Sequence, residues 1–306
     1  MTRILVTGAS GLLGFHFAWQ ASQKAEVIGI THSQELVNTP FQSVKMDLSQ
    51  PGMGEKIITQ YKPDVLVHCA ALANVDACDL QPELADRMNA ALPGELAESA
   101  EKNSVRMVHI STDAIFDGNK GNYREDDEPN PLSTYARTKL KGEQAVLQTC
   151  PDAIVARVNF FGWSMSGKRS LAEWFISNLA AGRVVNGFTD IFFCPLEVSQ
   201  LCEFLQMMLE KDLKGLFHVV SSESISKYAF GVKLAEAFGF ESKLIKPVSW
   251  KEGGLLAARS PLLTLDTDKL TKALGIIMPG IQEGINRFHQ QYETLWPLKM
   301  RKTLTA

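Results

Sequence analysis

Short runs of β-branched and other apolar residues alternate with longer segments of helical periodicity, and this alternation constrains the fold more than any other sequence feature. The apolar runs lie at residues 3–7, 26–30, 43–46, 64–68, 105–110 and 153–158, and the helical segments at about 11–24, 51–61, 81–102 and 133–149. Strands that are apolar throughout are typical of a parallel sheet covered by helices on both faces. Right-handed crossovers then predict an α/β fold with a doubly wound parallel sheet.

The alternation becomes less regular after residue 160. Residues 161–195 carry aromatic residues and glycines but few clear strands, whereas residues 216–220 have the pattern of a returning strand. We therefore predict a first domain at residues 1–160 and, at residues 161–306, mainly a smaller C-terminal domain that binds substrate. Part of that second half, about residues 190–220, is expected to complete the large sheet.

A glycine-rich turn joins the first predicted strand to the first predicted helix, with glycines at Gly8, Gly11 and Gly14. Glycine is needed where the chain turns tightly and where backbone must approach a diphosphate without an intervening Cβ. The N-terminus of the following helix offers free N–H groups to the anion. The placement of the motif predicts that residues 1–160 bind a dinucleotide in a Rossmann-like fold. A purely structural tight turn is the alternative.

The end of the second predicted strand bears on which dinucleotide binds. A carboxylate there binds the ribose 2′-hydroxyl of NAD, whereas a basic or small polar group tolerates the 2′-phosphate of NADP. This chain has Thr31, His32 and Ser33 at that place and no carboxylate. The sequence thus favours NADP(H) over NAD(H) as the cofactor.

Tyr135 and Lys139 lie four residues apart near the start of a predicted helix. Residues at this spacing share a helix face, and an ammonium group near a phenol lowers the pKa of the phenol. A tyrosine whose pKa is lowered can serve as an acid or a base near neutral pH. Of the five tyrosines, only Tyr135 has a lysine or arginine four residues further on. We therefore predict that this pair is catalytic.

The segment Ser111-Thr112-Asp113 follows the fifth predicted strand. The carboxyl ends of the strands are where ligands bind in open α/β sheets. The hydroxyl of Thr112 could donate a hydrogen bond to a substrate carbonyl and stabilise the negative charge that develops there. Thr112 is therefore predicted to be the third catalytic residue, and an ordinary strand-end turn is the alternative.

Charge, cysteine usage and hydropathy exclude several classes of protein. A net charge of −3 in 306 residues argues against a nucleic-acid groove or a polybasic membrane patch. The five cysteines include no C-x-x-C pair and no histidine pair has zinc-ligand spacing, so we predict reduced thiols and no metal site. The sequence shows no signal-peptide pattern and no apolar run of about 20 residues. We expect a cytoplasmic protein that binds neither membranes nor nucleic acids.

Several segments together resemble the extended short-chain dehydrogenase/reductase family, and within it the dTDP-4-dehydrorhamnose reductase branch. Besides the glycine-rich turn, the similar segments are HCAALANVD at 68–76, ISTDAIFDG at 110–118, PLSTYARTKLKGE at 131–143 and LDTDKL at 265–270. The resemblance covers most of the chain, strongly to about residue 160 and loosely beyond. The same branch includes the regulatory β subunit of methionine adenosyltransferase.

The resemblance implies a role for each matching residue. Tyr135 would be the proton donor, and Lys139 would hold the nicotinamide ribose and tune Tyr135. Thr112, with Asp113 beside it, would contact the reacting carbonyl of the sugar, and Phe160 would pack on the sugar or on the nicotinamide. The other residues expected to hold the cofactor are Gly8, Gly11, Leu12, Leu13 and Gly14 at the diphosphate, Asp47 and Leu48 at the adenine, and Ala70, Ala71 and Leu72 at the nicotinamide.

The chain departs from this branch in three segments that are expected to form the substrate pocket. The tryptophan that follows the sixth strand in the reductases is missing from residues 157–162, where Phe160 stands. Their Arg-Pro-x-Asn segment becomes Arg259-Ser260-Pro261-Leu262 and loses its asparagine, and residues 190–196 are more apolar than usual. These departures bear on which sugar binds rather than on the cofactor.

The implied reaction is hydride transfer from NADPH to a 4-keto group of a nucleotide-linked deoxysugar, as in dTDP-rhamnose biosynthesis. An epimerase or dehydratase of the same family and a non-catalytic NADP-binding regulatory subunit are the alternatives. The implied partners are a nucleotide sugar and, because relatives often dimerise, a second copy of the chain. The sequence names neither the sugar nor the nucleotide, and no stretch of it specifies an oligomer.

Overall fold

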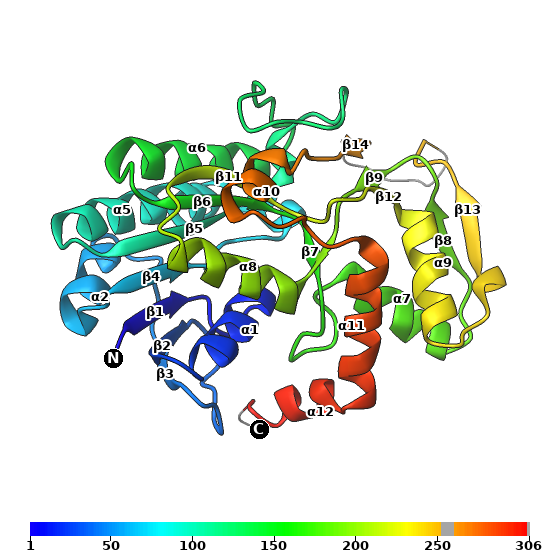
Figure 1. Cartoon of the computed structure of the whole chain (residues 1–306), viewed down its shortest axis with the longest axis horizontal. Coiled ribbons are helices and arrows are strands. Elements are labelled where there is room, and N and C mark those ends of the chain that lie inside the picture. Colours follow the sequence, from blue (N-terminus) through cyan, green and yellow to red (C-terminus); the bar gives the residue numbers. More distant parts are fainter. Residues whose placement is uncertain (252–259, 305–306) are drawn as a thin grey trace.

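Seven parallel strands form one sheet that is covered by helices on both faces (Figure 1). The structure is a computed structural model that describes residues 1–251 and 260–304. In spatial order the strands are β11 (Gly215–Val219), β6 (Ile154–Val158), β5 (Arg106–Thr112), β4 (Val65–His68), β1 (Arg3–Thr7), β2 (Glu26–Thr31) and β3 (Gln42–Lys45). The strand order reverses between β1 and β4, which is the switch point where ligands bind in such sheets. The predicted doubly wound, Rossmann-like sheet is confirmed.

The two faces of the sheet have separate apolar cores. One face carries α2 (Met53–Tyr61), α5 (Leu92–Lys102) and α6 (Thr134–Thr149), and the other carries α1 (Leu12–Ala21) and α8 (Val198–Glu210). Alternate strand residues point to opposite faces, so Leu5 packs in the α2 core while Ile4 and Val6 pack in the α1 core.

The segment predicted as one helix at 81–102 contains a π-helical turn. It consists of α4 (Pro82–Asp86), the π turn Arg87–Ala91 and α5, and a short α3 (Val75–Leu80) precedes it. The turn carries the buried Asn89, whose carbonyl oxygen would overlap a Cβ on Gly142 of α6. Turns of this kind are frequent at functional sites.

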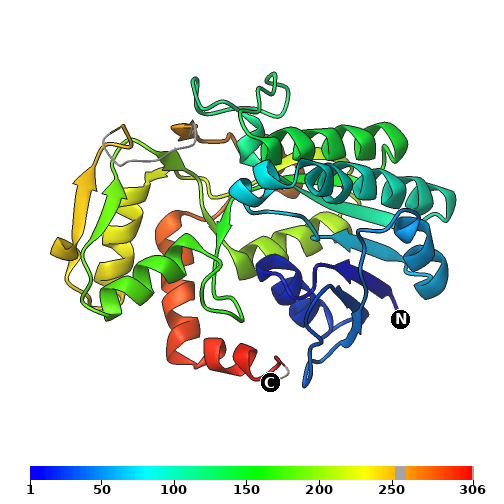
Figure 2. The same cartoon turned by 180° about the vertical axis from the view of Figure 1, so that it is seen from behind.

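The C-terminal half contributes one strand to the large sheet and also forms the group of elements beyond the end of the sheet. Its strand β11 pairs with β6, and α10 (Asp268–Leu274) packs against β11. The remainder forms a group of elements beyond the end of the sheet (Figures 1 and 2). Its elements are β7 (Phe160–Phe161), α7 (Leu171–Ala180), β8 (Val185–Phe188), β9 (Phe192–Phe193), β10 (Leu196–Glu197), β12 (Ile225–Ser226), α9 (Lys227–Ala237), β13 (Ile245–Val248), β14 (Leu262–Leu263), α11 (Ile281–Glu293) and α12 (Trp296–Arg301). In the part of the chain that the structure describes, no helix is long and apolar enough to cross a membrane.

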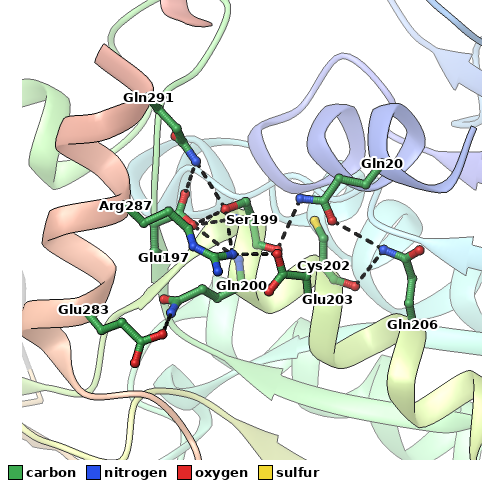
Figure 3. Close-up of polar contacts among 10 residues, drawn as sticks. All are labelled: Gln20, Glu197, Ser199, Gln200, Cys202, Glu203, Gln206, Glu283, Arg287 and Gln291. Atoms are coloured by element: carbon green, nitrogen blue, oxygen red, sulfur yellow. Dashed lines mark hydrogen bonds and ion pairs between the residues drawn. The ribbon is translucent and has the colours of Figure 1, made fainter. Parts of the chain in front are cut away.

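A cluster of polar side chains joins α8, α11 and α1 (Figure 3). At its centre the buried Glu197 carboxylate accepts hydrogen bonds from the backbone N–H of Ser199 at 2.9 Å, from the Ser199 hydroxyl and from Gln291 Nε2 at 3.2 Å. Burial raises the pKa of Glu197, and these donors oppose that rise. Because Glu197 lies in β10, which pairs with β7, the cluster anchors the strand that carries Phe160.

Candidate active site

A cavity of about 610 Å³ lies beside the glycine-rich turn, at the carboxyl ends of the strands around the switch point. It extends from the residues that follow β3 to those that follow β4 and to Phe160. Its lining includes Gly8, Gly11, Leu12, Leu13, Gly14, Asp47, Leu48, Ala70, Ala71 and Leu72. The structure thus brings these ten residues from three separate segments to one cavity.

The glycines make a cradle that side chains would fill. Gly8 has φ +70°, and a Cβ there would lie 2.8 Å from the backbone nitrogen of Ala70. A Cβ on Gly14 would overlap the carbonyl oxygen of Gly8, and the N–H of Gly11 donates to that oxygen at 2.8 Å. Bare backbone at the start of α1 is what a diphosphate needs for close approach, so these residues fit a dinucleotide.

The structure places a carboxylate, that of Asp47, beside the end of β2. The Asp47 carboxylate, contributed by the segment after β3, lies 3.6 Å from His32 Nε2, and both residues line the cavity. Hydrogen bonds from Ser49 hold the pKa of Asp47 below its usual value. The resemblance had placed Asp47 at the adenine, but the end of β2 alone shows no carboxylate for the ribose, and the pairing of β3 with β2 brings Asp47 next to it.

Tyr135, Thr112 and Lys139 come together at the end of β5 and the start of α6, but Lys139 does not lower the pKa of Tyr135. Burial raises the pKa of the Tyr135 phenol to about 12, and a hydrogen bond from the Thr112 side chain only partly opposes this rise. The Lys139 ammonium instead donates to the carbonyl oxygen of Ile110 at 2.6 Å. The expected phenolate is therefore corrected to a phenol that keeps its proton at neutral pH.

A carboxylate one helical turn further along α6, that of Glu143, favours the charged form of Lys139. Burial lowers the pKa of Lys139 to about 8, and the Glu143 carboxylate opposes that fall. Glu143 is itself held by Arg157 at 2.6 Å and by the hydroxyl of Ser111 at 2.8 Å. The buried ion pair of Glu143 and Arg157 therefore braces α6 against β5 and β6 beneath the site.

Asp113 is buried at the end of β5 and shares its carboxylate between two side chains. The amide of Asn159 donates to Oδ2 at 2.5 Å, and the hydroxyl of Thr112 donates to Oδ1 at 3.2 Å. Thr112 has one hydroxyl hydrogen, so it can serve Asp113, Tyr135 or a bound carbonyl one at a time. Asp113 therefore competes directly for the hydrogen bond that a substrate would need.

A second cavity, of about 150 Å³, adjoins the Asn159 side chain. Seven apolar side chains dominate its wall, and its polar groups include Ser133, Asn159 and Lys227. The apolar residues are Val75, Ala114, Leu132, Ile191, Phe192, Phe193 and Leu263. Phe160 lines the larger cavity rather than this one, and Arg259 lies outside the described residues.

Comparison with known proteins identifies the family. The model of the RmlD substrate binding domain matches residues 1–294. This chain belongs to the RmlD family. The match confirms the resemblance to the dTDP-4-dehydrorhamnose reductase branch and to its class of NAD(P)-dependent oxidoreductases.

The proteins that this chain resembles differ in function. The RmlD-family chain is 32% identical to the "Probable low-salt glycan biosynthesis reductase Agl14" of Haloferax volcanii, over 92% of this chain and 95% of that protein. It is 30% identical to methionine adenosyltransferase 2 subunit beta of Bos taurus, over 98% and 89%. A crystal structure of a dTDP-4-dehydrorhamnose reductase from Clostridium acetobutylicum superimposes with a TM-score of 0.84 at 27% identity, covering 95% of this chain and all of that one.

Sequence reasoning missed Asn89, which holds Leu72 in the cavity wall of this RmlD-family protein by hydrogen bonds. Its amide donates to the carbonyl oxygen of Leu72 at 3.0 Å and to the hydroxyl of Thr138 at 3.1 Å, and its Oδ1 accepts from the N–H of Leu72 at 2.9 Å. Asn89 thereby joins the segment after β4 to the face of α6 next to Lys139. No local pattern marks it, since its partners are distant in sequence.

Replacing Asp113 by asparagine is expected to stabilise this RmlD-family protein at neutral pH. Burial raises the pKa of Asp113 from 3.8 to about 6. The native fold therefore favours the protonated acid, and stability falls as the pH rises from about 4 through 6. Asp113→Asn should raise the unfolding free energy at pH 7.5 by roughly 2–3 kcal/mol and have little effect near pH 4. Urea unfolding at both pH values measures this, and an equal effect at both would contradict it.

Proposed function

We propose that the protein is a reductase that uses NADP(H) to reduce a 4-keto group of a nucleotide-linked deoxysugar. The observation that carries the proposal is the convergence of Tyr135, Thr112 and Lys139 at the end of β5 and the start of α6, beside Ile110, which lines the cavity with the backbone cradle for a diphosphate. We favour NADP(H) because His32 and Ser33 line the cavity after β2. Asp47 lies next to His32 in the same cavity wall, so the affinities for NADPH and NADH should be measured side by side.

The protein side chains account for the proton that the reduction consumes. NADPH supplies the hydride when it is bound. Tyr135 keeps its proton at neutral pH, because its pKa is about 12, and is therefore an acid able to protonate the oxygen of the reacting carbonyl. Thr112 donates a hydrogen bond to the same oxygen once its hydroxyl turns away from Asp113. The Lys139 ammonium lies behind the site, where it donates to the carbonyl oxygen of Ile110, and would hold the nicotinamide ribose.

The second cavity supports a deoxysugar as substrate. Its apolar residues from β9, β14 and the loops around them would exclude water from a methyl group that has replaced a sugar hydroxyl. Ser133 and Asn159 offer hydrogen bonds to the remaining hydroxyls. A site lined in this way discriminates against substrates that carry an extra hydroxyl there only modestly, by about one or two orders of magnitude.

The deciding experiment measures NADPH oxidation by the purified protein with dTDP-4-dehydrorhamnose. Stoichiometric consumption of NADPH is expected, whereas an epimerase or dehydratase would return the hydride and consume none. Tight NADPH binding without turnover on this or on other 4-keto nucleotide sugars would overturn the proposal. It would favour the second candidate, a non-catalytic regulatory subunit. The similarity to the bovine beta subunit, over 98% of this chain, is the observation that supports this candidate.

Gly14→Ala is expected to weaken NADPH binding by about tenfold or more, since the added Cβ would overlap the Gly8 carbonyl oxygen and distort the turn. Gly94→Ala is the matched control, because a Cβ at Gly94 would meet only Ala145 at an ordinary 3.5 Å. Fluorescence titration with NADPH measures both variants. Equal affinities for the two would show that the turn does not hold the dinucleotide.

A further inference from the structure

The loop between β7 and α7, residues 162–170, lies against the helix that follows the glycine-rich turn. His16 of α1 donates from Nε2 to the carbonyl oxygen of Trp163 at 2.9 Å. Burial lowers the pKa of His16 to about 4, so the ring is neutral and this hydrogen bond persists at neutral pH. A Cβ on Gly162 would lie 3.6 Å from the side chain of Leu12, the first residue of α1. The loop is thus attached to α1 close to the start of the helix.

A buried carboxylate holds the loop in one shape. Glu173 accepts hydrogen bonds from the backbone N–H groups of Ser164 at 2.6 Å, Arg169 at 2.9 Å and Ser170 at 3.1 Å. The Ser164 hydroxyl lies 3.0 and 2.8 Å from its two oxygens and donates its one hydrogen to either of them. The hydroxyl of Ser170 closes the loop on the carbonyl oxygen of Gly162 at 2.8 Å. The backbone of Arg169 is therefore fixed even though its side chain is exposed.

Arg169 brings a positive charge to the cavity wall. Among the described residues that line the larger cavity, it is the only lysine or arginine. A dinucleotide places a diphosphate, and in NADP also a 2′-phosphate, in a cavity whose cradle offers mainly backbone N–H groups. A guanidinium group on a preorganised loop is well suited to bind a phosphate through two parallel hydrogen bonds. Lys168, its neighbour on the same loop, does not line the cavity.

We propose that Arg169 binds a phosphate group of the dinucleotide and closes the cavity from the C-terminal half of the chain. The inference rests on the proposed function, since it requires that a dinucleotide binds in the cavity. Arg169 would thus provide a phosphate contact from the C-terminal half of the chain, in addition to the contacts made by the glycine cradle. The loop, held by Glu173 and attached to α1 through His16, is the element that positions the guanidinium.

The test compares Arg169→Ala with Lys168→Ala, its matched control, by titrating each variant with NADPH and with NADH. Arg169→Ala should raise the Kd for NADPH by about tenfold or more, and Lys168→Ala by less than about twofold. A similar loss with NADH assigns Arg169 to the diphosphate, and a loss confined to NADPH assigns it to the 2′-phosphate. Either result supports the proposal. The wild-type Kd should also rise with salt more steeply than that of Arg169→Ala.

Equal affinities of Arg169→Ala and Lys168→Ala for both dinucleotides would overturn this inference and leave the proposed function intact. A wild-type protein that binds neither dinucleotide would overturn both. Thermal unfolding of Arg169→Ala without dinucleotide should match that of the wild type, because its side chain is exposed and only its backbone N–H contacts Glu173. This control separates a lost phosphate contact from a lost fold.

Discussion

Tyr135→Phe is expected to lower kcat by roughly 10²–10⁴-fold, because the variant lacks the phenolic proton that is proposed to be transferred to the carbonyl oxygen. The ring stays in place, so the Kd for NADPH should change by less than about threefold. Steady-state kinetics with dTDP-4-dehydrorhamnose and titration with NADPH measure the two quantities separately. A large loss of kcat with unchanged binding is the signature of a group that acts in the transition state rather than in binding.

Tyr61→Phe is the control for this substitution. Tyr61 ends α2, and its carbonyl oxygen accepts from Arg3 at the amino end of β1, the edge of the sheet opposite the site. Loss of the Tyr61 hydroxyl should leave kcat unchanged. A Tyr135→Phe variant with wild-type kcat would show that another group delivers the proton.

Glu143→Ala is expected to destabilise the protein by roughly 3–5 kcal/mol, because it leaves the Arg157 guanidinium buried without its counter-ion. Both side chains are only 3% exposed and lie 2.6 Å apart. The variant also removes the acid that supports the charge of Lys139, so the pKa of Lys139 should fall. Urea unfolding measures the loss of stability.

An exposed ion pair on the same helix gives the matched control. Lys141 contacts Asp86 at 2.7 Å, but their side chains are 63% and 47% exposed. Lys141→Ala should therefore change the unfolding free energy by less than about 1 kcal/mol. Similar losses for Glu143→Ala and Lys141→Ala would refute the argument from burial.

The fold of the first half could be predicted because its signals are local. Apart from β3, each strand that this half contributes to the sheet is an apolar run, each crossover helix has its own periodicity, and the glycine-rich turn marks the junction between the first two elements. The second half could not be predicted in the same way. Strands such as β7, β9 and β10 have two residues each, too few for a pattern, and their partners are distant in sequence.

The candidate site divides along the same line. Tyr135 and Lys139 share a helix and could be predicted from their spacing and from the family resemblance, whereas Asn89 and Arg169 reach the site from elements that only tertiary structure brings together. The direction of the Tyr135 pKa was wrong for a related reason. Spacing reports which charge is near, but burial, the larger influence here, depends on everything packed around the phenol.

The position of β11 has a consequence for how the chain is made. β6 ends at Val158, yet its neighbour in the sheet begins only at Gly215, after α7, α8 and the small strands between them. On the ribosome, β6 remains an unpaired edge until those later residues emerge, and an unpaired edge strand invites association with other chains. A gene fragment cut near residue 160 would encode that exposed edge permanently. Copies of residues 1–160 expressed alone are therefore expected to associate with one another through β6.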